Sequence, residues 1–299
     1  MNNRHFKKIV KSNILIKIIL GIAILSSSIN PTKAFVPYVY QPSKVDLSKT
    51  GISVGKTALR LIHLGQTKEA IRLADLAVQL NPEDDRLWAI LAEAQLRNND
   101  LTKAELSLVK AKKLNPKKAG LWFAEASIAL RKKEAKKAVS LINHGLTMES
   151  NNAGAYFQLG NARIMQKKLA LALKAFQKAS NVEPKFWEAL NNQGLVLYEL
   201  GKTKQANIIW KAVLQIKRNP ETLLALATSL HTTEPNNKES INLVKEALAE
   251  NPNYVWSRHQ AEQLWGAKLQ EDTHKLLSRP ELSSDVERAI ANSDGNTDS

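Results

Sequence analysis

The stretch AYFQLGNARIMQ-KKLA-LALKAFQKASNV, residues 155–182, decides the fold. Apolar residues recur at intervals of three and four on both sides of the short link KKLA, which predicts two amphipathic helices. Gly160 and Ala172 stand where the two helix backbones approach closely, because larger side chains there would push the helices apart. Tyr156 and Phe176 fill the spaces between neighbours. The stretch therefore predicts a helix–turn–helix unit.

The same unit recurs along the chain with a period of 34 residues. That interval, or twice that interval, separates the prolines Pro82, Pro116, Pro184 and Pro252. A column of small residues keeps the same spacing: Ala70, Ala104, Ala138, Ala172, Ala206 and Ser240. A period of this length is typical of repeat architectures, and the Asn-Pro or Glu-Pro links end one helix before the next unit begins.

The repeating unit resembles the tetratricopeptide repeat (TPR). The fourth unit shows its pattern in Tyr156, Leu159, Gly160, Ala172 and Phe176, and the fifth in Leu190, Gly194, Leu197, Ala206 and Trp210. The resemblance covers six units: 51–84, 85–118, 119–152, 153–186, 187–220 and 221–254. The first and sixth are degenerate, as terminal units often are. The resemblance implies an all-α fold, a right-handed α-solenoid of about six repeats over residues 51–254.

The segments that flank the repeats differ from them in pattern. After the repeats, residues 255–279 predict one capping helix, whose Trp256 and Trp265 would cover the last apolar face. Residues 280–299 predict a short helix and a disordered acidic tail. Before the repeats, residues 35–50 contain two prolines and no helical period, so we expect an extended linker there.

Residues 1–34 have the order of a secretory signal peptide. Arg4, Lys7, Lys8 and Lys11 come first without any acid, an apolar run follows from residue 14 to residue 25, and small residues surround Lys33. We expect export to a periplasm or lumen, with cleavage near Ala34. The alternative is an uncleaved membrane anchor formed by residues 9–25, although Lys17 interrupts the apolar run and the run is short for a spanning helix.

Basic residues outnumber acids, and the chain has a formal net charge of +15. Six Lys and Arg residues lie in 1–34, so the remaining chain carries +9. Residues 103–137 hold eleven Lys and Arg against three Glu. This stretch is either a solvated face or a surface that attracts an anionic partner: an acidic protein, an anionic membrane surface or nucleic acid. Export and the lack of an aromatic stacking platform argue against nucleic acid.

The stretch TGISVGKT, Thr50–Thr57, is close to a phosphate-binding loop. However, three residues instead of four separate its first glycine from Gly55 and Lys56, and no strand precedes it. We interpret it as the start of a helix in the first repeat. The chain has no cysteine, its histidines are too widely spaced for a metal site, and no nucleophile stands with a base. We therefore predict no catalytic site, no metal and no cofactor.

The first helices of stacked repeats line a concave groove, which is suited to a peptide or a partner's helix. Asn side chains can pair with peptide backbone, and aromatic side chains supply anchors. The candidate groove residues are Phe123, Arg131, Phe157, Asn161, Asn191, Asn192, Leu195 and Tyr198. An alternative is that the Asn side chains only satisfy neighbouring helices.

Some TPR domains grip the carboxylate at the end of a peptide, and Asn161 and Asn192 match the two Asn positions of that clamp. Phe157, Thr222 and Leu226 occupy its basic positions, which argues against carboxylate recognition.

The leading hypothesis is a non-enzymatic scaffold or assembly factor that binds a peptide or helix of a partner protein. One alternative is an RNA-binding helical-repeat protein that uses the basic residues 103–137. Another is a regulatory subunit of an enzyme complex, which predicts stoichiometric co-purification with one enzyme.

Overall fold

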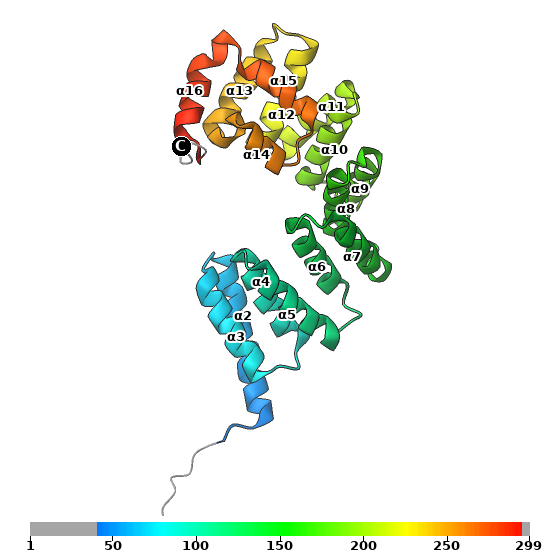
Figure 1. Ribbon diagram of the computed structural model, residues 1–299, viewed down its shortest axis with the longest axis vertical. Coiled ribbons are helices and arrows are strands. Elements are labelled where there is room, and N and C mark those ends of the chain that lie inside the picture. Colours follow the sequence, from blue (N-terminus) through cyan, green and yellow to red (C-terminus); the bar gives the residue numbers. More distant parts are fainter. Residues whose placement is uncertain (1–40, 295–299) are drawn as a thin grey trace, which may run out of the picture. The chain divides into compact units, whose positions relative to one another are not determined.

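The computed structural model describes residues 41–294, and Figure 1 shows them as a succession of helices. The predicted signal peptide and the first part of the predicted linker lie outside the described residues. Residues 45–294 belong to one compact unit. The hydrophobic clusters of this unit draw their members from residues 54–289. The unit therefore contains a core of its own and is able to fold by itself.

Twelve helices form the six predicted pairs. They are α2 (Lys44–His63), α3 (Thr67–Leu80), α4 (Asp85–Arg97), α5 (Leu101–Leu114), α6 (Ala119–Arg131), α7 (Ala135–Met148), α8 (Ala153–Met165), α9 (Leu169–Val182), α10 (Trp187–Glu199), α11 (Thr203–Ile216), α12 (Pro220–Thr233) and α13 (Lys238–Glu250). From α4 to α13 the two helices of each pair pack on one another, and from α3 to α11 the second helix of each pair packs on the first helix of the next. The units thus form a right-handed α-solenoid, as the resemblance implied.

Small residues let the two helices of a pair approach closely. A Cβ atom on Gly160 of α8 would lie 2.6 Å from Phe176 Cδ1 of α9, and one on Gly194 of α10 would lie 2.6 Å from Trp210 Cε2 of α11. Both aromatic side chains are completely buried. The glycine of one helix thus makes room for the aromatic ring of the other, which explains both columns of the repeat.

The turn within a pair has the same backbone conformation in successive units. Its residue with positive φ recurs every 34 residues, at Gly65, Asn99, Lys133, Lys167 and Gly201. The left-handed region costs an ordinary residue about 1 kcal/mol, so tertiary packing imposes this turn even where lysine occupies it. The sixth unit has Pro235 at this place, and α12 continues to Thr233.

The structure differs from the sequence prediction at both ends of the repeats. The linker prediction for residues 44–50 is wrong, because α2 begins at Lys44, after the last proline of that stretch, and Asp46 favours its first turn. Thr50–Thr57 therefore lies inside a helix, where Gly51 and Gly55 are buried. Gly55 packs so closely that a Cβ would collide with Leu87.

The predicted capping helix 255–279 is broken. The structure has a 3-10 turn η1 (Pro252–Val255), then α14 (Ser257–Glu262) and α15 (Ala267–Leu277). Leu264 takes a positive φ between the two helices, which ends α14 and redirects the chain. The short turn η2 (Pro280–Leu282) and α16 (Ser283–Asn292) follow. Among residues 41–294, no helix combines the length and the apolarity that crossing a membrane requires.

Candidate functional site

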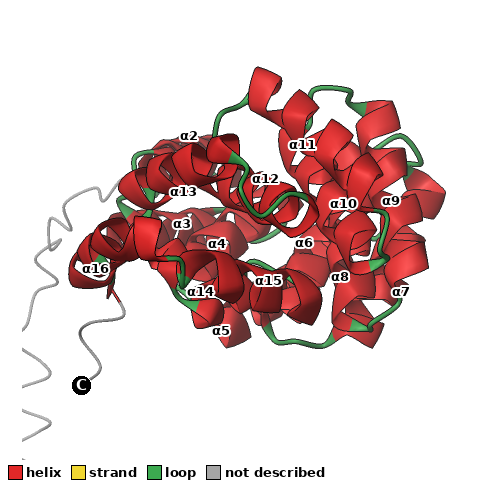
Figure 2. Cartoon of the chain, turned by 90° about the horizontal axis from the view of Figure 1, so that it is seen from above, coloured by secondary structure: helices red, strands yellow, loops and turns green. Residues whose placement is uncertain are grey.

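The first helices of the pairs form one layer, which we call the inner face, and the second helices form the outer face. Figure 2 shows α6, α8 and α10 on the inner side of α7, α9 and α11. The eight predicted groove residues all lie on these three inner helices, two on α6, two on α8 and four on α10. Their surroundings differ, and the differences decide which of them remain available to a partner.

A row of hydrogen-bonded polar side chains joins α8, α10 and α12. Asn192 Nδ2 donates to Asn161 Oδ1 at 3.1 Å, and Asn191 Nδ2 donates to Asn192 Oδ1 at 3.4 Å. Thr222 Oγ1 donates to Asn191 Oδ1 at 2.8 Å. Asn191 is only 1% exposed, so it serves the packing of its own helices. Asn161 is half-buried and uses only its oxygen in these bonds, so its Nδ2 can donate to a partner.

The two predicted phenylalanines are placed differently. Phe157 is half-buried, with ring centroids 5.8 Å from Phe176 and 5.1 Å from Phe186. Phe123 is buried and occupies the space beside Gly145, where a Cβ would lie 2.8 Å from Phe123 Cδ1. Only Phe157 thus offers exposed aromatic surface beside Asn161. Arg131 is exposed, and its Nη1 donates at 3.0 Å to the Leu96 carbonyl in the last turn of α4, which gives it a capping role.

Sequence reasoning missed Gln158, which precedes Asn161 by one helical turn on α8. Its Oε1 is buried and has no hydrogen-bond partner within the described part of the chain. A buried acceptor without a donor is unfavourable. Only the structure shows this state, because exposed and buried glutamines look alike in a sequence.

At the C-terminal end of the inner face, α15 packs against α10 and α12. It covers Tyr198, which is 0% exposed, and Leu195, which is 2% exposed, lies in the same hydrophobic cluster as Leu269 of α15. The Tyr198 hydroxyl donates to Asp272 Oδ2 at 2.8 Å, and Lys268 Nζ lies 3.9 Å from the centroid of the Tyr198 ring. Burial raises the pKa of Tyr198. The chain's own helix therefore occupies the surface that we predicted for a peptide at these two residues.

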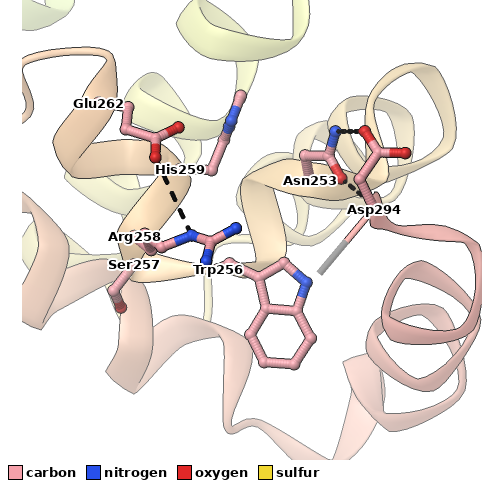
Figure 3. A pocket seen from close by; sticks show the side chains of 7 residues that line it. All are labelled: Asn253, Trp256, Ser257, Arg258, His259, Glu262 and Asp294. Atoms are coloured by element: carbon pink, nitrogen blue, oxygen red, sulfur yellow. Dashed lines mark hydrogen bonds and ion pairs between the residues drawn. The ribbon is translucent and has the colours of Figure 1, made fainter. Parts of the chain in front are cut away.

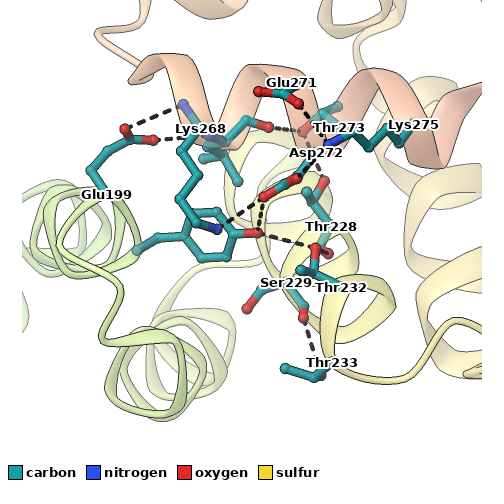
Figure 4. Close-up of polar contacts among 12 residues, drawn as sticks. Glu199, Thr228, Ser229, Thr232, Thr233, Lys268, Glu271, Asp272, Thr273 and Lys275 are labelled. Atoms are coloured by element: carbon teal, nitrogen blue, oxygen red, sulfur yellow. Dashed lines mark hydrogen bonds and ion pairs between the residues drawn. The ribbon is translucent and has the colours of Figure 1, made fainter.

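Glu199 fixes the start of α15, as Figure 4 shows. Its carboxylate accepts from the backbone N–H of Lys268 at 3.3 Å and from that of Leu269 at 2.8 Å. A carboxylate at a helix N-terminus satisfies free donors and complements the helix dipole. Deeper in the contact, the hydroxyls of Thr228 and Thr273 are 2.8 Å apart. The contact between α15 and the repeats is therefore polar as well as apolar.

A half-buried acid, Glu221, joins the sixth unit to the segment before α15. Trp265 Nε1 donates to Glu221 Oε1 at 3.0 Å. Burial raises the pKa of the Glu221 carboxyl to about 7, against the opposing effect of its hydrogen bonds from Trp265 and Asn191. The folded protein thus holds a proton on this group at pH values where an unfolded carboxyl, with a pKa near 4.5, has lost it.

We expect stability to fall as pH rises through this window. Below about pH 4.5 both states are protonated at Glu221, and between about 4.5 and 7 the unfolded chain alone releases the proton. At pH 8, Glu221→Gln should therefore be more stable to urea than the unmodified protein by about 1–3 kcal/mol, and at about pH 4 the two should be equally stable. The exposed Glu239→Gln variant, also in the first turn of a helix, is the control and should follow the unmodified protein at both pH values. Equal stability of Glu221→Gln and the unmodified protein at pH 8 would contradict this account.

An open pocket of about 470 Å³ lies among η1, α14 and the end of α16 (Figure 3). Its polar groups bind one another: Asn253 Nδ2 donates to Asp294 Oδ2 at 2.8 Å, and Arg258 lies 3.9 Å from Glu262. Trp256 Nε1 donates to Ser293 Oγ at 2.7 Å. These contacts hold the C-terminal helix in place. Between residues 41 and 294, no three His, Asp or Glu residues gather as metal ligands would.

Two models of the tetratricopeptide repeat match the chain, one at residues 61–128 and one at residues 157–210. Within these two stretches the helix pairs match the tetratricopeptide repeat. No curated protein sequence matches the chain at a significant level. The repeat resemblance is thus confirmed, while the signal peptide stays a prediction.

Several solved structures share the TPR fold. PilF of Pseudomonas aeruginosa is 16% identical over 77% of this chain and 99% of its own, with a TM-score of 0.60. PilW, described as a widely conserved type IV pilus biogenesis factor, is 16% identical over 74% and 97%, with a TM-score of 0.59. MamA from Desulfovibrio magneticus RS-1 is 21% identical over 58% and 96%, with a TM-score of 0.52. At these identities the likeness concerns the fold alone. TPR domains in general are protein-interaction modules.

Proposed function

We propose that this TPR protein is a non-enzymatic scaffold or assembly factor that holds a peptide or helix of a partner protein against its inner face. The observation that carries the proposal is the half-buried Asn161, whose Nδ2 is available beside the partly exposed Phe157 ring. An amide pairs with the backbone of an extended segment whatever its sequence, and an aromatic ring anchors one apolar side chain. The binding stretch lies at α8, because α15 covers the inner face at Leu195 and Tyr198.

The proposal is tested by capture from cell extract with residues 41–299 as bait. The double variant Asn161→Ala, Asn192→Ala removes both partners of one hydrogen bond. The buried Asn191 loses Asn192 Oδ1 as an acceptor, but it keeps its hydrogen bond to Glu221. We expect it to weaken partner binding by about 10-fold or more, measured by titration once the partner is identified. Asn143→Ala, on the exposed side of α7, is the matched control and should bind normally.

Nuclease treatment separates the alternatives. A protein partner that survives nuclease and is lost only in the double variant supports the inner face as the binding site. Capture that disappears with nuclease and ignores the double variant would favour the RNA-binding alternative instead. Stoichiometric recovery of one enzyme would favour the regulatory subunit.

We further propose that the protein acts outside the cytoplasm, in a periplasm or lumen, or at a membrane. The order of charged, apolar and small residues in 1–34 supports this. Fractionation followed by N-terminal sequencing tests it. A mature chain that begins close to residue 35 in the exported fraction is expected, and an intact Met1 in the cytoplasmic fraction would contradict the proposal.

A further inference from the structure

Two large aliphatic side chains stand on the outer face of α5 without a covering element. Leu106 is 63% exposed and Val109 is 50% exposed, although the opposite side of the same helix buries Ala104, Leu108 and Ala111 in the core. Helix α5 therefore carries more apolar surface than its packing in the solenoid uses. Exposed aliphatic side chains of this size, side by side on one helix, mark a surface that meets another apolar phase.

Lysines continue the same stripe. Lys110 and Lys113 follow Leu106 at helical spacings of four and seven residues, so all four side chains share one side of α5. Neither lysine has an ion-pair partner among residues 41–294. The helix has one acid, Glu105, and that acid already pairs with Lys132 and Lys137 of the next unit. The exposed side of α5 is thus apolar at its centre and positive at its end.

The neighbouring second helices extend the positive charge. Helices α7, α9 and α11 contain no Asp or Glu, and together with α5 they hold ten lysines. Leu171 of α9 and Ile208 of α11 are also exposed, at 43% and 70%. The second helices at the two ends differ, since α3 contains Glu69 and Asp75 and α13 contains Glu239 and Glu246. The basic and apolar character is therefore a property of the middle of the outer face.

We propose that the outer face docks on an anionic phospholipid surface, with α5 as its main contact. Leu106 and Val109 would enter the boundary between headgroups and acyl chains, while Lys110 and Lys113 keep their ammonium groups at the level of the lipid phosphates. Helix α5 has no aromatic side chain on which a base could stack, and an exposed helix side offers no groove for a peptide. The inner face stays free for a protein, so the two proposals can fail independently.

The test uses residues 41–299, because the folded unit has its own core and the apolar run at 14–25 would bind vesicles by itself. Flotation is measured with vesicles of phosphatidylcholine alone and with vesicles containing about one third phosphatidylglycerol. We expect binding to the anionic vesicles only, and a decrease on raising the salt concentration. Leu106→Ser with Lys110→Glu should lower the partition coefficient by about tenfold or more.

Helix α3 supplies the matched control, because Leu76 is exposed on it, as is Lys68. Leu76→Ser with Lys68→Glu makes the same chemical changes on a second helix that has acids, and it should change the partition coefficient less than about twofold. Circular dichroism verifies that both variants are folded. Absence of binding to anionic vesicles, equal binding to neutral vesicles, or equal losses in the α3 and α5 variants would overturn the proposal.

Discussion

Replacement of Trp210 by alanine will lower the free energy of unfolding by about 3–5 kcal/mol. The indole is completely buried, packs over Gly194 and donates from Nε1 to the Asn191 carbonyl at 3.2 Å. Alanine would leave a cavity beside the backbone of α10. Helix α10 cannot move into this cavity, because its other contacts hold it in place. It would also leave the Asn191 carbonyl without this donor. Urea unfolding followed by circular dichroism measures the loss.

Trp122→Ala is the control for this prediction, because it removes the same side chain from a different environment. Trp122 is partly exposed, donates to the Pro116 carbonyl at 3.0 Å, and lies under Lys112 Nζ at 4.0 Å from its ring centroid. We expect a smaller loss than at Trp210, because solvent can fill the space. If both variants lose the same free energy of unfolding, the close contact between Trp210 and Gly194 does not determine the size of the loss.

Replacement of Gly160 by valine will destabilise the protein by about 3 kcal/mol or more. A Cβ at this position would lie 2.6 Å from Phe176 Cδ1 and Cζ, and the Phe176 ring is completely buried. The ring cannot turn away without displacing α9 from α8. Valine also loses side-chain freedom in a helix, which adds a smaller cost. The shift of the thermal unfolding midpoint measures the combined effect.

Gly154 in the same helix gives the opposite expectation. The nearest atom to a Cβ added at this position would be Asn152 Oδ1 at 3.5 Å, an ordinary contact. Gly154→Ala should therefore leave stability unchanged or raise it by up to about 1 kcal/mol, because alanine restricts the unfolded chain more than glycine does.

Phe176→Leu should recover part of the stability that the Gly160→Val variant loses, since the two side chains share one space. No recovery would place the cause of the loss elsewhere.

The repeated part of the fold could be predicted because each unit repeats the same packing problem. The columns that contain Gly160, Ala172 and Phe176 correspond to direct contacts between the two helices of a pair. The contacts of α15 could not be predicted in this way, because they join Tyr198 to Asp272, 74 residues away, and no period relates them. Nothing in the local pattern near Tyr198 distinguishes a groove that is open from one that the chain itself covers.

The sequence predicts on which helices the candidate residues lie, but it predicts less well which of them are exposed. The periodicity places Asn161 and Asn192 on adjacent inner helices, and the structure joins them by a hydrogen bond. Phe123 looked equivalent to Phe157, but it is buried beside Gly145. A signal for this difference existed, since the matching positions Ala111 and Ala179 of the neighbouring units carry a methyl group where the third unit has only hydrogen. A glycine in that column makes room for a ring.

The packing of α15 and α16 on the last repeat also affects whether one molecule can bind end to end to another. In a repeat array, the surface by which one unit contacts the next is similar in every unit. If the last unit leaves this surface uncovered, the first unit of another molecule can bind to it. Head-to-tail contacts of that kind do not close on themselves and lead to filaments. Here α15 packs on α12, and α16 packs on α13. The C-terminal helices thereby cover the surface through which a head-to-tail array would grow at this end.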